Sequence, residues 1–168
     1  MTDADFRNAF QSHKDIVYRF AYRMTGSNAT AEDIAQDCFV TLWRKPGAFD
    51  PSRGTLRSFL LGIVRNLVLK RWRSERPLEL LDEAMEDGSP AGLPFDVAGQ
   101  ERDEAVRNAI MTLPPLQREA LILAEYEELS LAEIGAATAS ELAAVKSRLH
   151  RARQNLRRVL EPLFANRR

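Results

Sequence analysis

The segment SLAEIGAATASELAAVKSRLHRAR, residues 130–153, decides the fold class of the chain. It opens with Ser130 and Glu133, which have the S-x-x-E spacing of a capping box, where each side chain bonds the other residue's backbone N–H. A turn near Thr138–Ser140 follows, and apolar residues at steps of three and four then predict a long helix to about Leu160. A short helix, a tight turn and a long basic helix occur in this order in a helix-turn-helix.

The long helix has two different faces. One is a narrow apolar stripe made by Leu142, Val145, Leu149, Ala152, Leu156 and Leu160. The opposite face begins with small residues and continues with polar and basic ones, which can reach phosphates or base edges in a DNA groove. A charged surface helix of a bundle would show the same face, so this alternative stays open.

Working outward, the rest of the chain is also helical. Apolar periodicity predicts helices over residues 4–24 and 56–73, a helix capped by Thr30, and one that begins near Pro115. The first of these is expected to bury Phe6, Phe10, Ile16, Val17, Phe20 and Ala21. No alternating run is long enough for a strand.

A proline- and glycine-containing segment, residues 77–104, divides the chain. It holds 1 basic and 9 acidic side chains, a net charge of −8, whereas residues 1–76 carry +5 and residues 105–168 carry +3. We therefore predict an all-α protein with two small helical domains, residues 1–76 and 105–168, joined by a flexible acidic linker. The basic ends suit a polyanion.

Composition excludes several classes of protein. The 168 residues are 45% hydrophobic and 29% charged, as in globular proteins. One cysteine and two distant histidines give neither a disulfide framework nor a familiar zinc spacing. We find no secretory signal or membrane-spanning run, and expect a cytoplasmic protein without metal or cofactor and without membrane insertion.

Residues 31–43, AEDIAQDCFVTLW, form a helix whose outer face is unusual. Cys38 lies among inward-facing apolar residues and is expected to be a small buried hydrophobe. The outer face collects Asp33, Gln36, Asp37 and Val40, with Trp43 along one edge. An exposed valine and tryptophan beside charges suit a protein interface better than an active site, although simple solvation remains possible.

The helix over residues 56–73 carries Gly62, Asn66, Lys70 and Arg73 along one flank. A glycine inside a helix costs about 1 kcal/mol relative to alanine, so Gly62 needs a reason. Two explanations for this glycine remain open, which are the close packing of a neighbouring helix and the close approach of a nucleic-acid strand.

Taken together, these segments resemble a bacterial sigma factor of the extracytoplasmic-function (ECF) group, a transcription initiation factor associated with stress responses. The similarity extends from about Phe10 to Leu160. GSNATAEDIAQDCFVTLW resembles the region that binds the polymerase, and FDPSRGTLRSFLLGIVRNLVLKRWR the region that melts and recognises the minus-ten element. LPPLQREALILAEYEELSLAEIG with VKSRLHRAR resembles the domain that recognises the minus-thirty-five element.

The resemblance implies partners and roles residue by residue. The partners are core RNA polymerase, through its β′ clamp helices and β flap, promoter DNA and an anti-sigma factor. The polymerase-binding residues are Asp33, Gln36, Asp37, Val40 and Trp43. Those for the minus-ten element are Arg53, Arg57, Asn66, Lys70, Arg71 and Arg73, with Asn66 and the loop 50–55 forming a pocket for a flipped base. Those for the minus-thirty-five element are Lys146, Ser147, Arg148, His150 and Arg151. The acidic linker would lie toward the active-site cleft and RNA exit path of the polymerase.

The chain departs from the family pattern at the turn. Ala139 replaces the usual glycine, and alanine tolerates a positive φ less well. Ala143 and Ala144 replace a Gly-Thr pair, which removes a hydroxyl suited to a phosphate. A stand-alone helix-turn-helix regulator remains the alternative function, while an enzyme would need an acid–base or metal constellation that we do not find in the sequence.

Overall fold

The structure is a computed structural model and describes residues 1–75 and 101–165. All regular elements in these two stretches are helical. In chain order they are α1 (Asp3–Thr25), α2 (Asn28–Arg44), the short 3-10 helices η1 (Pro46–Ala48) and η2 (Pro51–Arg53), α3 (Leu56–Ser74), α5 (Arg102–Met111), α6 (Pro115–Glu125), α7 (Leu131–Thr138) and α8 (Leu142–Ala165). The all-α prediction is confirmed.

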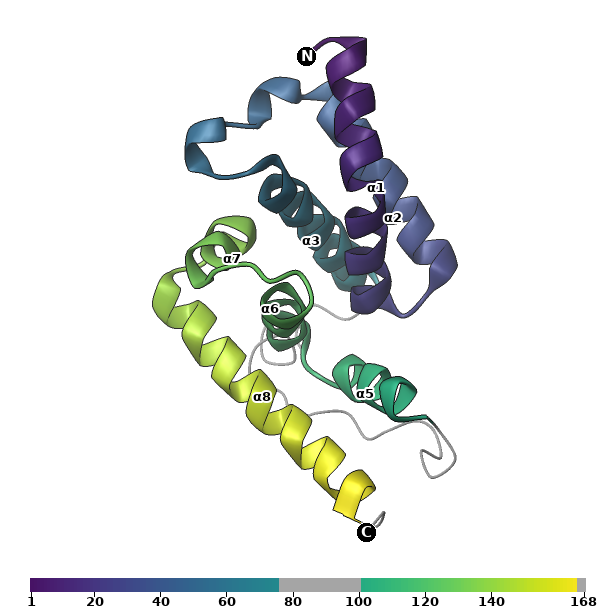
Figure 1. Cartoon of the computed structure of the whole chain (residues 1–168), viewed down its shortest axis with the longest axis vertical. Coiled ribbons are helices and arrows are strands. Elements are labelled where there is room, and N and C mark those ends of the chain that lie inside the picture. The colour runs from purple at the N-terminus through teal and green to yellow at the C-terminus, as the bar shows by residue number, and fades with distance from the viewer. Residues whose placement is uncertain (76–100, 166–168) are drawn as a thin grey trace.

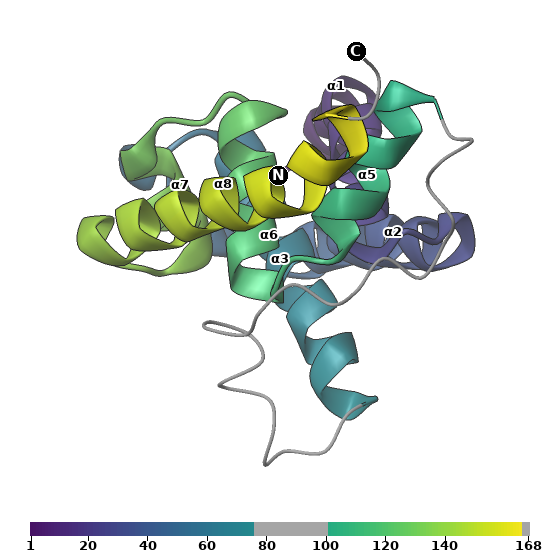
Figure 2. The ribbon, with the colours of Figure 1, turned by 90° about the horizontal axis from the view of Figure 1, so that it is seen from below.

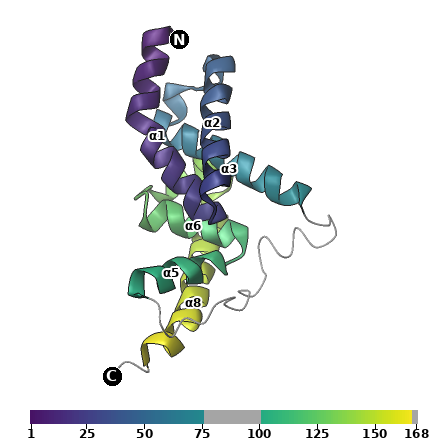
Figure 3. The same cartoon turned by 90° about the vertical axis from the view of Figure 1, so that its right-hand side faces the viewer.

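The first two helices form an antiparallel hairpin and lie side by side in Figure 3. Gly26 closes α1 in the left-handed region at φ 69°, where glycine has no steric penalty. Ser27 then caps α2 by accepting a hydrogen bond from the backbone N–H of Thr30. The predicted cap at Thr30 is wrong by one turn, because the serine already has the extended backbone of a capping residue.

Helix α3 crosses this hairpin and completes the N-terminal module, residues 1–75. Thr55 caps it, and its far end projects away from the rest of the molecule in Figures 2 and 3. The Cys38 side chain is fully buried here, with its Sγ 3.6 Å from the carbonyl oxygen of Leu60. Cys38 is therefore a buried hydrophobe, as predicted. The largest fully buried side chains of this module are Phe20, Met24, Ile34, Leu42, Leu60 and Leu61.

The C-terminal module, residues 101–165, contains the predicted helix-turn-helix. Pro115 is the first residue of α6, and the capping box of Ser130 and Glu133 opens α7 with both hydrogen bonds present. The turn after α7 places Ala139 in the left-handed region at φ 50°. The chain thus adopts a left-handed conformation with alanine at the position where the resemblance implies glycine.

Several helix boundaries differ from the prediction. Helix α5 was not expected, and its first residues, 102–104, belonged to the predicted linker, whose residues 77–100 lie outside the described stretches. Helix α6 ends at Glu125, and Glu128 in the turn after it has a φ of 56°. Helix α8 continues to Ala165 and includes Pro162.

The two modules pack against each other around one hydrophobic core, to which both contribute. Figure 1 shows the arrangement, with α7 and α6 beneath α3 and the two termini at opposite ends. A Cβ on Gly62 would lie 2.9 Å from the carbonyl oxygen of Ala137, closer than real Cβ atoms come. In this structure the glycine therefore permits the close packing of α7, which is the first of the two reasons considered for it.

Candidate functional site

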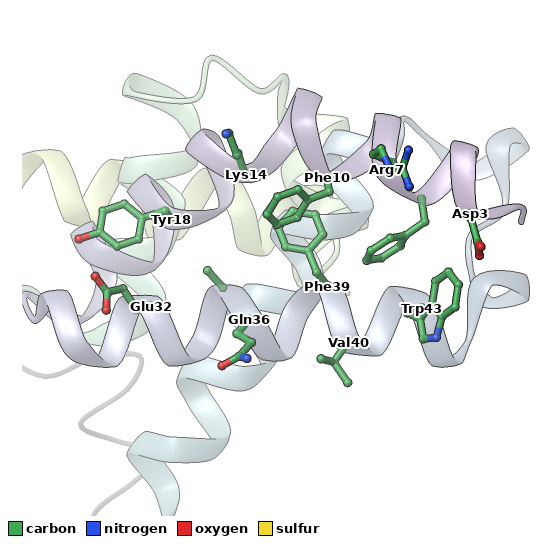
Figure 4. A pocket seen from close by; sticks show the side chains of 12 residues that line it. Asp3, Arg7, Phe10, Lys14, Tyr18, Glu32, Gln36, Phe39, Val40 and Trp43 are labelled. Atoms are coloured by element: carbon green, nitrogen blue, oxygen red, sulfur yellow. The ribbon is translucent and has the colours of Figure 1, made fainter.

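An apolar groove of about 920 Å³ runs between α1 and α2. Figure 4 shows its two walls, with the aromatic rings gathered between the helices. The Phe6 ring meets the Trp43 ring edge-on at 5.0 Å between centroids, and Phe10 meets Phe39 in the same way at 4.9 Å. Charged side chains such as Arg7 lie along the rim. The groove presents aromatic surface to a partner with ionic groups around it, which is typical of protein interfaces.

Three of the five predicted polymerase-binding residues line this groove. They are Gln36, Val40 and Trp43, and the last is 50% exposed. Asp33 and Asp37 are also exposed but lie outside the lining, and Asp33 is 3.9 Å from the guanidinium of Arg71 on α3. The two aspartates therefore form a separate acidic edge of the same helix.

The half of the groove that α1 supplies was not predicted from the sequence. Phe10 was assigned to the core but is 37% exposed, and Phe6 is only partly buried. With Lys14 and Tyr18 they form a row at steps of four residues, beside the core stripe. This row was the available signal, although periodicity alone does not distinguish a core face from a groove.

A second pocket, of about 580 Å³, lies where the loop 50–55 meets α3. Asp50 holds this loop by accepting hydrogen bonds from the Ser52 hydroxyl at 2.7 Å and the Ser52 backbone N–H at 2.9 Å, which lower the pKa of its carboxyl group. Asn66 and Gly62 line the pocket from α3. The loop and Asn66, which the resemblance places around a flipped base, therefore do share one cavity.

The opposite wall of this cavity comes from the helix-turn-helix. Ala136, Ala137 and Ala139 line it together with the α3 residues. Nothing in the sequence predicted this neighbour, because the packing of the two modules depends on contacts between distant parts of the chain.

The predicted cations of the minus-ten face are spread along the N-terminal module. Arg53 is exposed and pairs with Asp50 at 3.7 Å, whereas Lys70 and Arg73 lie on the exposed surface of the projecting end of α3. Arg57 points to the other module instead, where it donates to the backbone carbonyl oxygen of Glu127 at 2.7 Å.

A third surface is the outer face of α8. Lys146, Ser147, His150 and Arg151 are exposed there, whereas Val145, Leu149 and Ala152 are buried. Arg148 does not join them, since it is partly buried and donates to the Ser140 hydroxyl at 2.7 Å across the turn. Leu142, assigned to the apolar stripe, is 48% exposed because it begins the helix beyond the edge of the core.

The contact between the modules contains a buried ion pair. Arg65 of α3 donates to the carboxylate of Glu119 of α6 at 2.9 Å. Burial raises the pKa of the Glu119 carboxyl group above its usual range, against the opposing effect of the guanidinium. Nearby, Arg118 donates to the carbonyl oxygens of Met24, Met111 and Leu113, and so joins the end of α1 to the C-terminal module.

The described residues give no sign of a metal site, a membrane-spanning helix or a reactive cysteine. No group of three or more histidine, cysteine, aspartate or glutamate side chains there could hold a metal ion. None of the described helices is both long and apolar enough to cross a membrane. Burial raises the pKa of the Cys38 thiol to about 12, so this side chain is no nucleophile.

Comparison with protein families matches both modules. The sigma-70 region 2 family matches residues 9–77, and the sigma-70 region 4 family matches residues 103–156. The chain is 36% identical to the ECF RNA polymerase sigma factor SigE of Mycolicibacterium smegmatis, over 88% of this chain and 58% of SigE. It is 32% identical to SigW of Bacillus subtilis, over 94% of this chain and 90% of SigW.

Solved structures agree with the family match. The sigma factor RpoE of Bartonella quintana, solved in complex with the anti-sigma factor NepR, has a TM-score of 0.73 at 25% identity, over 94% of this chain and 97% of RpoE. CnrH, in complex with the cytosolic domain of CnrY, shares the fold with a TM-score of 0.69 at 23% identity, over 96% of this chain and 90% of CnrH. The chain is therefore a member of the ECF group of RNA polymerase sigma factors.

Proposed function

We propose that this chain directs promoter-specific transcription initiation by binding core RNA polymerase and recognising two DNA elements. The observation that carries the proposal is the presence of both sigma-70 regions on one short chain, region 2 first and region 4 second. A larger partner such as core polymerase can hold two DNA-binding modules of one chain at a fixed spacing along a promoter. A stand-alone regulator would instead bind duplex operator without polymerase, commonly as a symmetric dimer.

We place the polymerase-binding surface on α2, with the groove beside it. Val40 and Trp43 supply the exposed apolar area at the centre of such an interface, and Asp33 and Asp37 supply charge at its edge. An interface with an apolar centre and a charged rim is the usual arrangement in protein complexes. The β′ clamp helices are the proposed partner here, and the β flap is the proposed partner of the C-terminal module.

We place recognition of the minus-ten element at the second pocket. Asn66 lines this pocket and carries an amide with both donor and acceptor groups. Lys70, Arg71 and Arg73 continue from there along α3 and would hold the adjacent backbone.

Recognition of the minus-thirty-five element is assigned to the outer face of α8, through Lys146, Ser147, His150 and Arg151. Arg148 instead stabilises the turn, through its bond to Ser140. Ala143 and Ala144 near the start of α8 provide no hydroxyl for a phosphate.

We further propose an anti-sigma partner and no catalytic activity of the chain's own. RpoE was solved with an anti-sigma factor, and CnrH with the cytosolic domain of CnrY. The chain would act in the cytoplasm with the polymerase, which supplies all of the chemistry.

The test is in vitro transcription with purified core polymerase and a genomic library, followed by mapping of the start sites. We expect starts that share a pair of motifs at a fixed spacing. Reversing Asp33 and Asp37 to Lys should abolish holoenzyme assembly in gel filtration without loss of helicity. Asp15→Lys, an exposed aspartate of α1 outside the groove lining, is the matched control. If the double variant still assembles, the clamp assignment is wrong, and if the wild-type chain does not assemble, the proposed function is wrong.

A further inference from the structure

Glu127, in the loop after α6, is a buried carboxylate surrounded by arginines of the other module. Its side chain is 1% exposed, and its oxygens lie 3.4 Å from Arg23, 3.4 Å from Arg57 and 3.8 Å from Arg19. The Arg23 guanidinium also lies 4.1 Å from the centre of the Tyr126 ring. One acidic side chain of the C-terminal module thus occupies a site built by three cations of the N-terminal module.

The charges at this site do not balance. A buried carboxylate needs a cation to offset its lost hydration, but one would be sufficient and three are present. The N-terminal module therefore holds positive charge in excess here. The guanidinium group binds carboxylate and phosphate oxygens with the same paired N–H groups, so the three arginines suit a phosphate as well as they suit Glu127.

The position of the site connects it to DNA. Arg57 lies directly after the loop 50–55 and in the first turn of α3, whose later residues Gly62 and Asn66 line the pocket assigned to the minus-ten base. The contact that brings Glu127 onto the arginines also brings Ala136 and Ala137 across that pocket. Both features of the N-terminal module are thus covered by the same packing of the C-terminal module.

We infer that Arg19, Arg23 and Arg57 form a binding site for a phosphate of promoter DNA, which the carboxylate of Glu127 fills while the two modules are packed together. In this closed form the chain blocks its own minus-ten face, and separation of the modules exposes the phosphate site and the pocket together. The inference rests on the proposed function, which makes DNA the ligand, and adds to it two contacts of α1 and a state in which the chain is inactive.

The test measures binding of the full chain to fluorescent oligothymidylate by anisotropy at several NaCl concentrations. Glu127→Gln keeps the size of the side chain, removes its charge and should raise the affinity about tenfold, since a chain that is mostly closed binds in proportion to its open fraction. Glu125→Gln is the matched control, because Glu125 pairs with Arg153 at 2.7 Å inside the C-terminal module. It removes the same charge from the same helix end and should change the affinity little.

A second comparison tests the phosphate site itself. Adding Arg19→Gln and Arg23→Gln to Glu127→Gln should abolish the gain. It should also reduce the slope of log affinity against log salt by about 0.7 for each phosphate that the arginines no longer neutralise. If Glu127→Gln does not fold, Glu119→Gln, which weakens the other ion pair between the modules, takes its place.

Two results would overturn the inference. One is an equal gain for Glu127→Gln and Glu125→Gln, which would mean that only the net charge matters. The other is a gain that survives removal of Arg19 and Arg23, which would mean that these arginines do not bind the DNA. Neither result depends on core polymerase, so the inference and the proposed function can fail separately.

Discussion

Ala139 at the turn of the helix-turn-helix offers a direct test of the fold. Its φ of 50° and ψ of 45° lie in the left-handed region, which costs a residue with a Cβ roughly 1–2 kcal/mol. Glycine has no such cost there, but it lowers the free energy of unfolding by about 0.4–1 kcal/mol, because it raises the entropy of the unfolded chain. Ala139 is exposed, so Ala139→Gly removes no buried contact. We expect a net stabilisation of about 0.5–1 kcal/mol.

The assay is urea denaturation followed by circular dichroism, together with a thermal melt. The midpoint should rise with an unchanged m-value, and the melting temperature should rise by about 1–4 °C for a chain of this length. Ala136→Gly is the control, because Ala136 is exposed in the interior of α7, where glycine costs about 1 kcal/mol. The same substitution three residues apart should thus have opposite signs, and destabilisation by both would refute the left-handed turn.

Three further predictions concern other parts of the chain. Ser130→Ala should destabilise the C-terminal module by about 1 kcal/mol in the same denaturation assay, because it removes one side of a capping box; no change would mean that water replaces the hydroxyl at no cost. Because burial raises the pKa of Cys38 to about 12, the thiol stays protonated at pH 8 and should react with a disulfide reagent only as fast as the chain unfolds; rapid reaction in the native state would contradict its burial. Arg151→Ala should weaken holoenzyme binding to the upstream promoter element by about 1–3 kcal/mol if it contacts a base, and an equal loss on unrelated DNA would reassign it to the backbone.

Local features of the fold could be predicted from the sequence, and the reason is physical. The capping box at Ser130 and the proline that opens α6 each depend on a few adjacent residues. Helix α5 was missed because it is only 10 residues long and begins inside the segment that its prolines and glycines marked as a linker. Its buried residues include only Ala105, Ala109 and Ile110.

The candidate surfaces were only partly predictable. The exposed residues of α2 and α8 followed from helical periodicity, since one face of each helix had to be the core. Periodicity could not show that Phe10 lines a groove, because an apolar residue suits a groove as well as a core. It also could not show that Arg57 meets Glu127, which lies 70 residues away along the chain.

The position of Trp43 gives the protein a built-in optical signal. The chain contains two tryptophans, and Trp43 is the one in the aromatic groove, half exposed and in edge contact with Phe6. The fluorescence of a half-exposed indole shifts to shorter wavelength when a bound partner excludes water from it. Titration of the unlabelled chain should therefore show a blue shift whenever the groove is filled, and Trp43→Phe, which leaves Trp72 in place, would identify the source of that shift.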